Sequence, residues 1–180
     1  MLFLRVQTDG VRNSGRADCE MWGCMLYYTY DTPFGKMAIA DDGAAITHVL
    51  LCDKISFDAE KKASPLTDRA AAELEEYFEG KRQSFDVPLN PKGTEFQKRV
   101  WNALTKVPYG ETRTYKDIAI VAGNEKACRA VGMAKNRNPI WIIIPCHRII
   151  GANKSLTGYG GGLDMKKKLL DLESAQHSLV

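Results

Sequence analysis

The longest uninterrupted apolar stretch of the chain, Ile140–Pro145, ends in a proline and is followed directly by Cys146, His147 and Arg148. Such a run predicts a strand buried on both faces, because a strand with one exposed face alternates apolar and polar residues. It is far shorter than the roughly 18 residues of a membrane-spanning helix. We therefore expect a sheet in the interior, no membrane span, and reactive side chains where the buried strand ends.

Length and composition predict two folded domains preceded by an extension. The chain has 180 residues, of which 44% are hydrophobic and 26% charged, which excludes a disordered or collagen-like protein. Residues 1–24 are mostly polar and aperiodic, so we expect a disordered extension or an upstream mis-start. We expect a small α/β domain over residues 25–90 and a mainly helical domain over residues 91–180.

The cysteines predict a reducing environment. There are five, scattered along the chain, which argues against a disulfide scaffold and favours a cytoplasmic protein. Cys19 and Cys24 have the spacing of half a metal site, but no second ligand pair accompanies them. We therefore expect no metal.

Residues 25–90 carry strand signals followed by helix signals. Apolar runs at 26–30, 34–40 and 44–52 are separated by turn residues and predict three strands. Ser64 is expected to cap a helix whose apolar residues recur every fourth position and which ends at Gly80.

The charge is unevenly distributed. Residues 1–90 carry 10 basic and 15 acidic side chains, whereas residues 91–180 carry 15 basic and 7 acidic ones. The basic second half favours a polyanionic partner, with nucleic acid as the first candidate; a solvated basic surface is the alternative.

Three short helices are predicted in the second half. Thr94 and Gln97 form a capping box, and Thr114 is expected to cap a helix that ends at Gly123. Asn124 is expected to cap a third helix, over residues 125–135. The last two helices match a helix-turn-helix, although ordinary helix packing uses small residues in the same way. The residues that would face DNA on the third helix are Ala127, Arg129, Ala130 and Gly132.

Cys146 and its neighbours form a candidate reactive thiol, for which a buried structural cysteine is the alternative. Free cysteine is mostly thiol at neutral pH, so a base or cation is needed to produce thiolate. Side chains adjacent in extended chain point in opposite directions, which favours a water-bridged relay between Cys146 and His147. An acid should orient the histidine: Glu173 is the first candidate, and spacing leaves Asp164 and Asp171 open.

Several motifs together resemble the O6-alkylguanine-DNA alkyltransferase family. The most specific is Ile144-Pro145-Cys146-His147-Arg148, preceded by Asn138-Pro139 and followed by Gly158-Tyr159-Gly160-Gly161-Gly162-Leu163. Upstream motifs continue in the family's order: Val107-Pro108-Tyr109-Gly110-Glu111, Thr114-Tyr115, Ala122-Gly123-Asn124 and Arg129-Ala130-Val131-Gly132. The similarity covers residues 93–173, and it is looser over residues 26–88.

The resemblance implies a fold and a DNA-binding mode. An RNase H-like N-terminal domain would precede a helix-turn-helix domain that carries the acceptor cysteine. The recognition helix would enter the minor groove, with Thr114 among its DNA contacts. The damaged nucleotide would rotate out of the duplex while Arg129 fills the vacated stack.

The resemblance also implies the chemistry. The Cys146 thiolate would take the alkyl group, and His147, held by Glu173, would be the base that acts through water. Tyr115 would protonate the departing base, and Asn138 would order the turn around the cysteine. The side chains and backbone expected to line the base pocket are those of Tyr159, Gly160 and Arg148.

The implied activity is irreversible repair of O6-alkylguanine, and of O4-alkylthymine, in double-stranded DNA. A thioether is not hydrolysed, so each molecule acts once and needs no cofactor. We expect a monomer in the cytoplasm, associated with the nucleoid in a prokaryote. Two rivals are a non-catalytic sensor of alkylated DNA that recruits repair factors, which the presence of Cys146 disfavours, and a cysteine hydrolase, which the adjacency of Cys146 and His147 disfavours.

Overall fold

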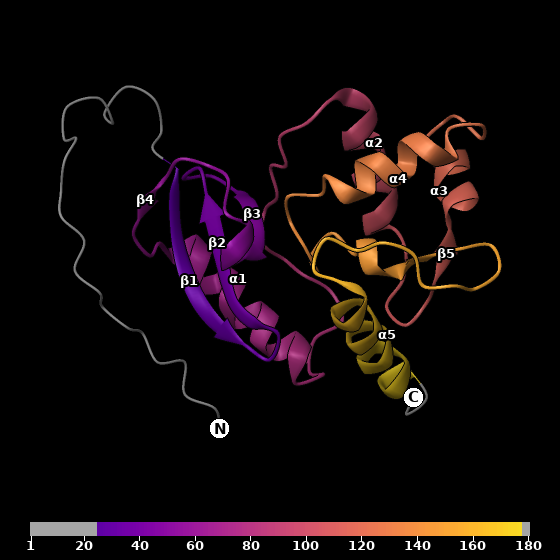
Figure 1. Ribbon diagram of the computed structural model, residues 1–180. Coiled ribbons are helices and arrows are strands. Elements are labelled where there is room, and N and C mark those ends of the chain that lie inside the picture. The colour runs from indigo at the N-terminus through magenta and orange to yellow at the C-terminus, as the bar shows by residue number, and fades with distance from the viewer. Residues whose placement is uncertain (1–24, 178–180) are drawn as a thin grey trace.

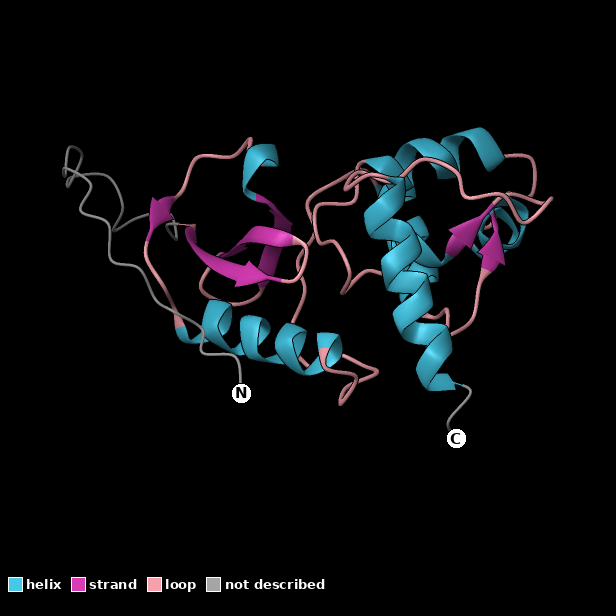
Figure 2. Ribbon diagram, turned by 60° about the horizontal axis from the view of Figure 1, so that its bottom comes forward, coloured by secondary structure: helices cyan, strands magenta, loops and turns pink. Residues whose placement is uncertain are grey.

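The computed structural model describes residues 25–177, which form two parts joined by an extended connection (Figures 1 and 2). The extension predicted for residues 1–24 lies outside the described residues, as do Cys19 and Cys24. Within residues 25–177, no helix is long and apolar enough to cross a membrane.

The N-terminal part is a four-stranded sheet with one helix on a face. The strands are β1 (Leu26–Thr32), β2 (Gly35–Asp41), β3 (Ile46–Leu51) and β4 (Glu60–Lys61). Their order is β3-β2-β1-β4; β2 is antiparallel to both neighbours, and β4 is parallel to β1. A short 3₁₀ turn, η1 (Cys52–Lys54), follows β3. The three strands predicted from the apolar runs are confirmed.

Helix α1 (Pro65–Phe78) covers the sheet, as Figure 2 shows. The predicted cap is confirmed: the Ser64 hydroxyl accepts a hydrogen bond from the Thr67 backbone, and the Thr67 hydroxyl accepts one from the Ser64 backbone. Gly80 follows the helix at φ +76°, a left-handed conformation that glycine adopts without steric cost. Local sequence therefore fixes both ends of α1.

The C-terminal part is mainly helical. Its elements are α2 (Glu95–Thr105), β5 (Arg113–Thr114), α3 (Tyr115–Val121), α4 (Cys128–Asn136), the 3₁₀ turn η2 (Cys146–Arg148), β6 (Ile149–Ile150) and α5 (Leu163–His177). Strands β5 and β6 form a two-stranded parallel pair. The capping box predicted at Thr94 and the helix cap predicted at Thr114 are both present, and Thr114 forms a capping box with Asp117.

The predicted cap at Asn124 is wrong. Helix α4 begins at Cys128, three residues later than expected, and its N-cap, Ala127, makes no side-chain capping bond. The Asn124 side chain instead accepts a hydrogen bond from the Lys126 backbone at 3.1 Å, and its carbonyl accepts one from the Ala127 backbone at 3.0 Å. Asn124 thus closes a turn that precedes the helix.

The strand predicted at Ile140–Ile144 is also wrong, although the segment is buried as expected. Only its first residues pair with β3, where the Trp141 backbone donates to the Val49 carbonyl at 2.9 Å. Ile142 then adopts φ +71°, and the Ile144 backbone donates to the Ile140 carbonyl at 3.1 Å. The run folds back as a tight turn, because tertiary hydrogen bonds override the preference of isoleucine for extended chain.

Candidate active site

The turn after Ile140 carries Cys146 into the interior. Asn138, which is buried, organises this turn: its Nδ2 donates to the Ile144 carbonyl at 2.9 Å and to Cys146 Sγ at 3.2 Å, and its Oδ1 accepts from the Ile140 backbone at 3.0 Å. The amide therefore holds both the loop and the sulfur. Cys146 itself is only 3% exposed.

Glu173, on α5, joins the site to both parts of the protein. Its carboxylate lies 2.8 Å from His147 Nε2 and accepts bonds from the Arg148 guanidinium at 2.9–3.2 Å. It also accepts from the Tyr77 hydroxyl of α1 at 2.7 Å and from the Gly110 backbone at 3.2 Å. Four donors thus converge on one buried carboxylate.

Of the three acids left open by sequence spacing, Glu173 is the one that contacts the histidine. It is 1% exposed, whereas Asp164 and Asp171 lie on exposed positions of α5. Glu173, the first candidate among the three acids, is therefore the one in contact with His147.

Burial and the neighbouring charges shift the titration of these groups. Burial alone would raise the pKa of Glu173, but the hydrogen bonds and charges of His147 and Arg148 lower it from 4.5 to about 2. Burial lowers the pKa of His147 despite the opposing effect of Glu173, and burial raises the pKa of Cys146 despite Asn138 and two nearby lysines. In this closed arrangement the cysteine is a thiol, the imidazole is neutral and the carboxylate is charged.

The hydrogen bond to Glu173 fixes the tautomer of His147. A carboxylate can only accept, so Nε2 carries the hydrogen and Nδ1 carries the lone pair. His147 Nδ1 is buried and has no hydrogen-bond partner among the described residues. The free lone pair is therefore available to accept a proton.

Tyr115, at the start of α3, is tied to the loop 151–162. Its hydroxyl lies 2.7 Å from Thr157 Oγ1, and Lys135 Nζ of α4 lies 3.1 Å from the same oxygen. Lys135 is buried and also donates to the Gly158 carbonyl. The tyrosine oxygen thus sits between a hydroxyl and an ammonium group.

Tyr159 and Gly160 are packed against the rings of neighbouring residues. Tyr159 is buried, its ring is edge-on to His147 at 6.5 Å, and its hydroxyl has no partner among the described residues. A Cβ atom on Gly160 would lie 2.6 Å from a ring carbon of Trp141. The space beside the glycine is therefore filled by the indole.

Arg148 was expected to line the base pocket. Its guanidinium contacts Glu173, Val107 and Tyr109. It binds Glu173, donates to the Val107 carbonyl at 2.6 Å and lies over the Tyr109 ring at 5.7 Å. Its hydrogen bonds hold the carboxylate that orients His147.

The residues expected to face DNA lie on or before α4 and at the start of α3. Arg129 and Ala130 are exposed on α4, Ala127 precedes the helix and is half-buried, and Thr114 caps α3. Gly132 is packed: a Cβ there would meet the Tyr115 ring at 3.6 Å. Helices α3 and α4 pack against each other and against α2.

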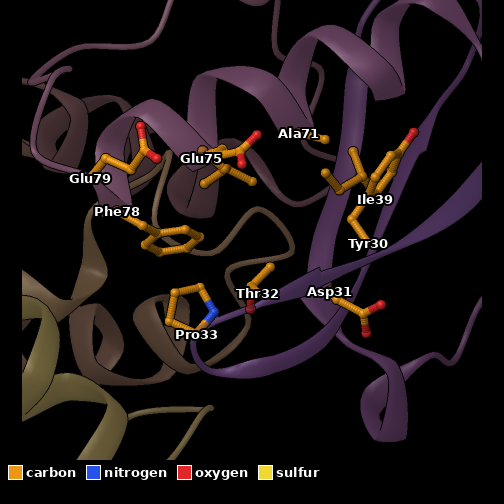
Figure 3. Close-up of a pocket in the computed structure, with 10 residues that line it drawn as sticks. Tyr30, Asp31, Thr32, Pro33, Ile39, Ala71, Glu75, Phe78 and Glu79 are labelled. Carbon is orange, nitrogen blue, oxygen red and sulfur yellow. The ribbon is translucent and has the colours of Figure 1, made fainter. Parts of the chain in front are cut away.

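Three cavities lie away from the thiol. One of about 440 Å³ lies beside Pro145 and Tyr109, and one of about 240 Å³ lies beside Gly110 and Leu170. A third, of about 360 Å³, lies between the β1–β2 hairpin and α1 (Figure 3). None of these three is lined by Cys146. Because Cys146 is buried, some of the side chains covering its sulfur must move before a base can reach it.

The third cavity offers no reaction chemistry. Figure 3 shows the Phe78 ring facing Pro33 across it, with the carboxylates of Glu75 and Glu79 on the helix side. No cysteine, histidine or lysine lines this cavity. The nucleophile, base and acid converge only around Cys146.

Three residues of the site, Tyr77, Lys135 and Lys166, are not among those expected from the sequence. Tyr77 lies on the buried side of α1. Lys166 belongs to a run of three lysines, a pattern typical of an exposed helix face, yet it is fully buried and donates to the Thr157 carbonyl at 2.9 Å. The spacing of Lys135 is a signal in the sequence: it follows Gly132 by three residues, which places both residues on one face of α4.

Comparison with known proteins identifies both parts of the chain. Residues 25–91 match the ribonuclease-like domain, and residues 95–175 the DNA-binding domain, of 6-O-methylguanine DNA methyltransferase. The methylated-DNA–protein-cysteine methyltransferase of Methanosarcina acetivorans is 50% identical, over 84% of this chain and 99% of its own. The constitutive enzyme of that name from Bacillus subtilis is 45% identical, over 83% and 96%.

The fold agrees with these sequence similarities. The solved structure of Mycobacterium tuberculosis OGT in complex with DNA superposes with a TM-score of 0.80 at 44% identity, covering 84% of this chain and 94% of that one. The expected two-domain architecture, a ribonuclease-like domain followed by a DNA-binding domain, is thereby confirmed. The chain belongs to the 6-O-methylguanine DNA methyltransferase family.

Proposed function

We propose that the protein repairs DNA by moving the alkyl group of O6-alkylguanine, or of O4-alkylthymine, in duplex DNA onto its own Cys146. The observation that carries the proposal is the buried Cys146 thiol held by Asn138 beside the His147–Glu173 pair, in a chain whose relatives are named methylated-DNA–protein-cysteine methyltransferases.

The first step is deprotonation of the thiol. Because burial raises the pKa of Cys146, a base must remove its proton when substrate arrives. His147 supplies the lone pair on Nδ1 through a bridging water, and the Glu173 carboxylate stabilises the imidazolium that forms.

The second step is in-line displacement at the alkyl carbon. A sulfur–carbon bond forms, the carbon–oxygen bond breaks, and its electron pair passes to the guanine. A purine anion is a poor leaving group, so Tyr115 donates its hydroxyl proton to the departing base. The thioether does not hydrolyse, and each molecule acts once.

DNA binding belongs to the α3–α4 pair, which we propose is a helix-turn-helix with α4 in the minor groove. Exposed Arg129 on α4 supports this role: it would fill the stack left by the rotated nucleotide, with Ala127, Ala130 and Thr114 beside the backbone. Gly132 of α4 is proposed to belong to the same DNA-facing set. We further propose that the protein is a cytoplasmic monomer whose domain boundary lies at residues 90–91.

The decisive experiment weighs the intact protein after incubation with duplex DNA containing O6-methylguanine. One added methyl group on the peptide that contains Cys146, and none in Cys146→Ser, is expected. Tight binding of the lesion without added mass would instead favour the sensor of alkylated DNA, and repeated turnover would favour a hydrolase.

The role of Arg129 has its own test. Arg129→Ala should slow transfer from duplex DNA at least about tenfold while leaving transfer from the free base O6-methylguanine within about twofold, because unstacking a base costs a few kcal/mol only in a duplex. Equal losses on both substrates would refute the stacking role.

A further inference from the structure

Two lysines are buried in the active-site region without an ion-pair partner. Lys135 is 3% exposed and Lys166 is 0% exposed, and no carboxylate within residues 25–177 forms a salt bridge with either. Their ammonium groups are satisfied by carbonyl oxygens of Ile149, Thr157 and Gly158 and by the Tyr115 hydroxyl. Burying a charge without a counter-charge is costly, so its placement calls for a function.

The contact between Lys135 and Tyr115 has a fixed direction. An ammonium group can only donate hydrogen bonds, so at 3.1 Å the Tyr115 oxygen must accept from Lys135 Nζ. The phenol's own hydrogen remains free for a second partner, and Thr157 Oγ1, which can donate or accept, lies 2.7 Å from the phenol oxygen in the closed site. Lys135 therefore leaves the tyrosine proton pointing away from α4.

Helix α4 holds both ends of the Tyr115 side chain. Gly132 and Lys135 are three residues apart and lie on one face of the helix. The tyrosine ring rests against Gly132, while Lys135 Nζ lies 5.4 Å from the ring centroid and reaches the hydroxyl. Two neighbouring turns of α4 thus contact the ring and the hydroxyl of the same tyrosine.

We propose that Lys135 is a positioning residue that aims the Tyr115 hydroxyl proton at the leaving base and replaces that proton once it has been donated. This inference rests on the proposed function, in which Tyr115 is the proton donor. It adds the group that returns a proton to the Tyr115 oxygen.

The proton steps balance. As the carbon–oxygen bond breaks, the Tyr115 proton moves to a ring nitrogen of the departing guanine, and a Lys135 proton moves to the phenolate oxygen. Lys135 is left as a neutral amine and takes a proton from water when the site opens.

The test is a double-mutant cycle on single-turnover methyl transfer from O6-methylguanine DNA. The variants are Tyr115→Phe, Lys135→Gln and the double variant. Glutamine can still donate to the Gly158 carbonyl but has no proton to give up, so it separates chemistry from loop support. Lys98→Met, which removes an exposed lysine of α2, is the matched control.

We expect Tyr115→Phe to slow transfer about 100-fold and Lys135→Gln about tenfold. In the Tyr115→Phe background, Lys135→Gln should slow it by less than about twofold, because the residue acts through the tyrosine. Lys98→Met should stay within about twofold of the unaltered protein.

If Lys135→Gln slows methyl transfer about tenfold in both backgrounds, the two effects are independent. That result would overturn the proposed proton transfer from Lys135 to Tyr115 and leave Lys135 with a structural role. Should Lys135→Gln fail to fold, Lys135→Met is taken through the same cycle under the same criterion. If the unaltered protein gains no methyl group on Cys146, the proposed function itself fails; methylation of Cys146 with independent mutational effects refutes only the role of Lys135.

Discussion

Replacing Glu173 by glutamine tests whether one buried carboxylate holds the two parts of the protein together. Glutamine keeps the size of the side chain and removes the charge that pairs with Arg148 and accepts the hydrogen bond of His147. Breaking a buried ion pair by removing one partner costs about 3–5 kcal/mol. The lowered pKa gives a matching value, because a fall from 4.5 to about 2 corresponds to about 3 kcal/mol of stabilisation at neutral pH.

The sign of the pH dependence follows from the direction of the shift. A carboxyl whose pKa is lower in the folded protein stabilises it fully above pH 4.5, and this contribution is lost as pH falls toward 2. We therefore expect Glu173→Gln to lower the free energy of unfolding by about 3 kcal/mol at pH 7. At pH 3 the difference from the unaltered protein should shrink by about 2 kcal/mol.

Urea titrations monitored by circular dichroism at both pH values measure the effect. Glu76→Gln is the control, because Glu76 forms an exposed ion pair with Arg82 that should contribute less than about 1 kcal/mol. A difference below 1 kcal/mol for Glu173→Gln at pH 7, or one that does not change between pH 7 and pH 3, would refute the assignment of Glu173 as the charged centre of the site.

Three further predictions concern the surroundings of the site and the first helix. Gly160→Ala should lose about 1–3 kcal/mol in urea unfolding, because its methyl group would lie 2.6 Å from Trp141, whereas Gly158→Ala, with nothing within 4 Å, should lose little; equal losses would contradict the packing. Ser64→Ala should lower the urea midpoint by the equivalent of about 1 kcal/mol, and an unchanged midpoint would exclude the cap. The His147 ring should be neutral at pH 7 by ¹⁵N NMR and should titrate below 6.5, since burial lowers its pKa; a titration centred on or above 6.5 would disprove this.

Features encoded within a few residues were predictable from the sequence. The caps at Ser64, Thr94 and Thr114 depend on side chains three positions apart, and all three form as predicted. The Glu173–His147 contact was also among the expected ones, although only the folded chain distinguishes it from Asp164 and Asp171.

Features that depend on distant contacts were not predictable. An apolar run predicts burial, but the turn at Ile142 is imposed by pairing with β3 and by Asn138, neither of which local propensity records. Lys166 belongs to a run of three lysines, a pattern typical of a solvated helix face. Its burial becomes visible only when the carbonyls of Ile149 and Thr157 are placed beside it.

The enclosure of Cys146 determines how long an idle molecule of this protein keeps its capacity to react. On the proposed mechanism each molecule has one usable sulfur, and peroxide would consume it as irrevocably as a lesion once oxidation passes the sulfenic stage. Oxidants attack thiolates that solvent reaches, whereas this sulfur is 3% exposed and its pKa is raised by burial. Cys52 and Cys128, which are both more exposed, would be oxidised first. The sulfur is thus preserved in storage and is spent only when damaged DNA opens the site.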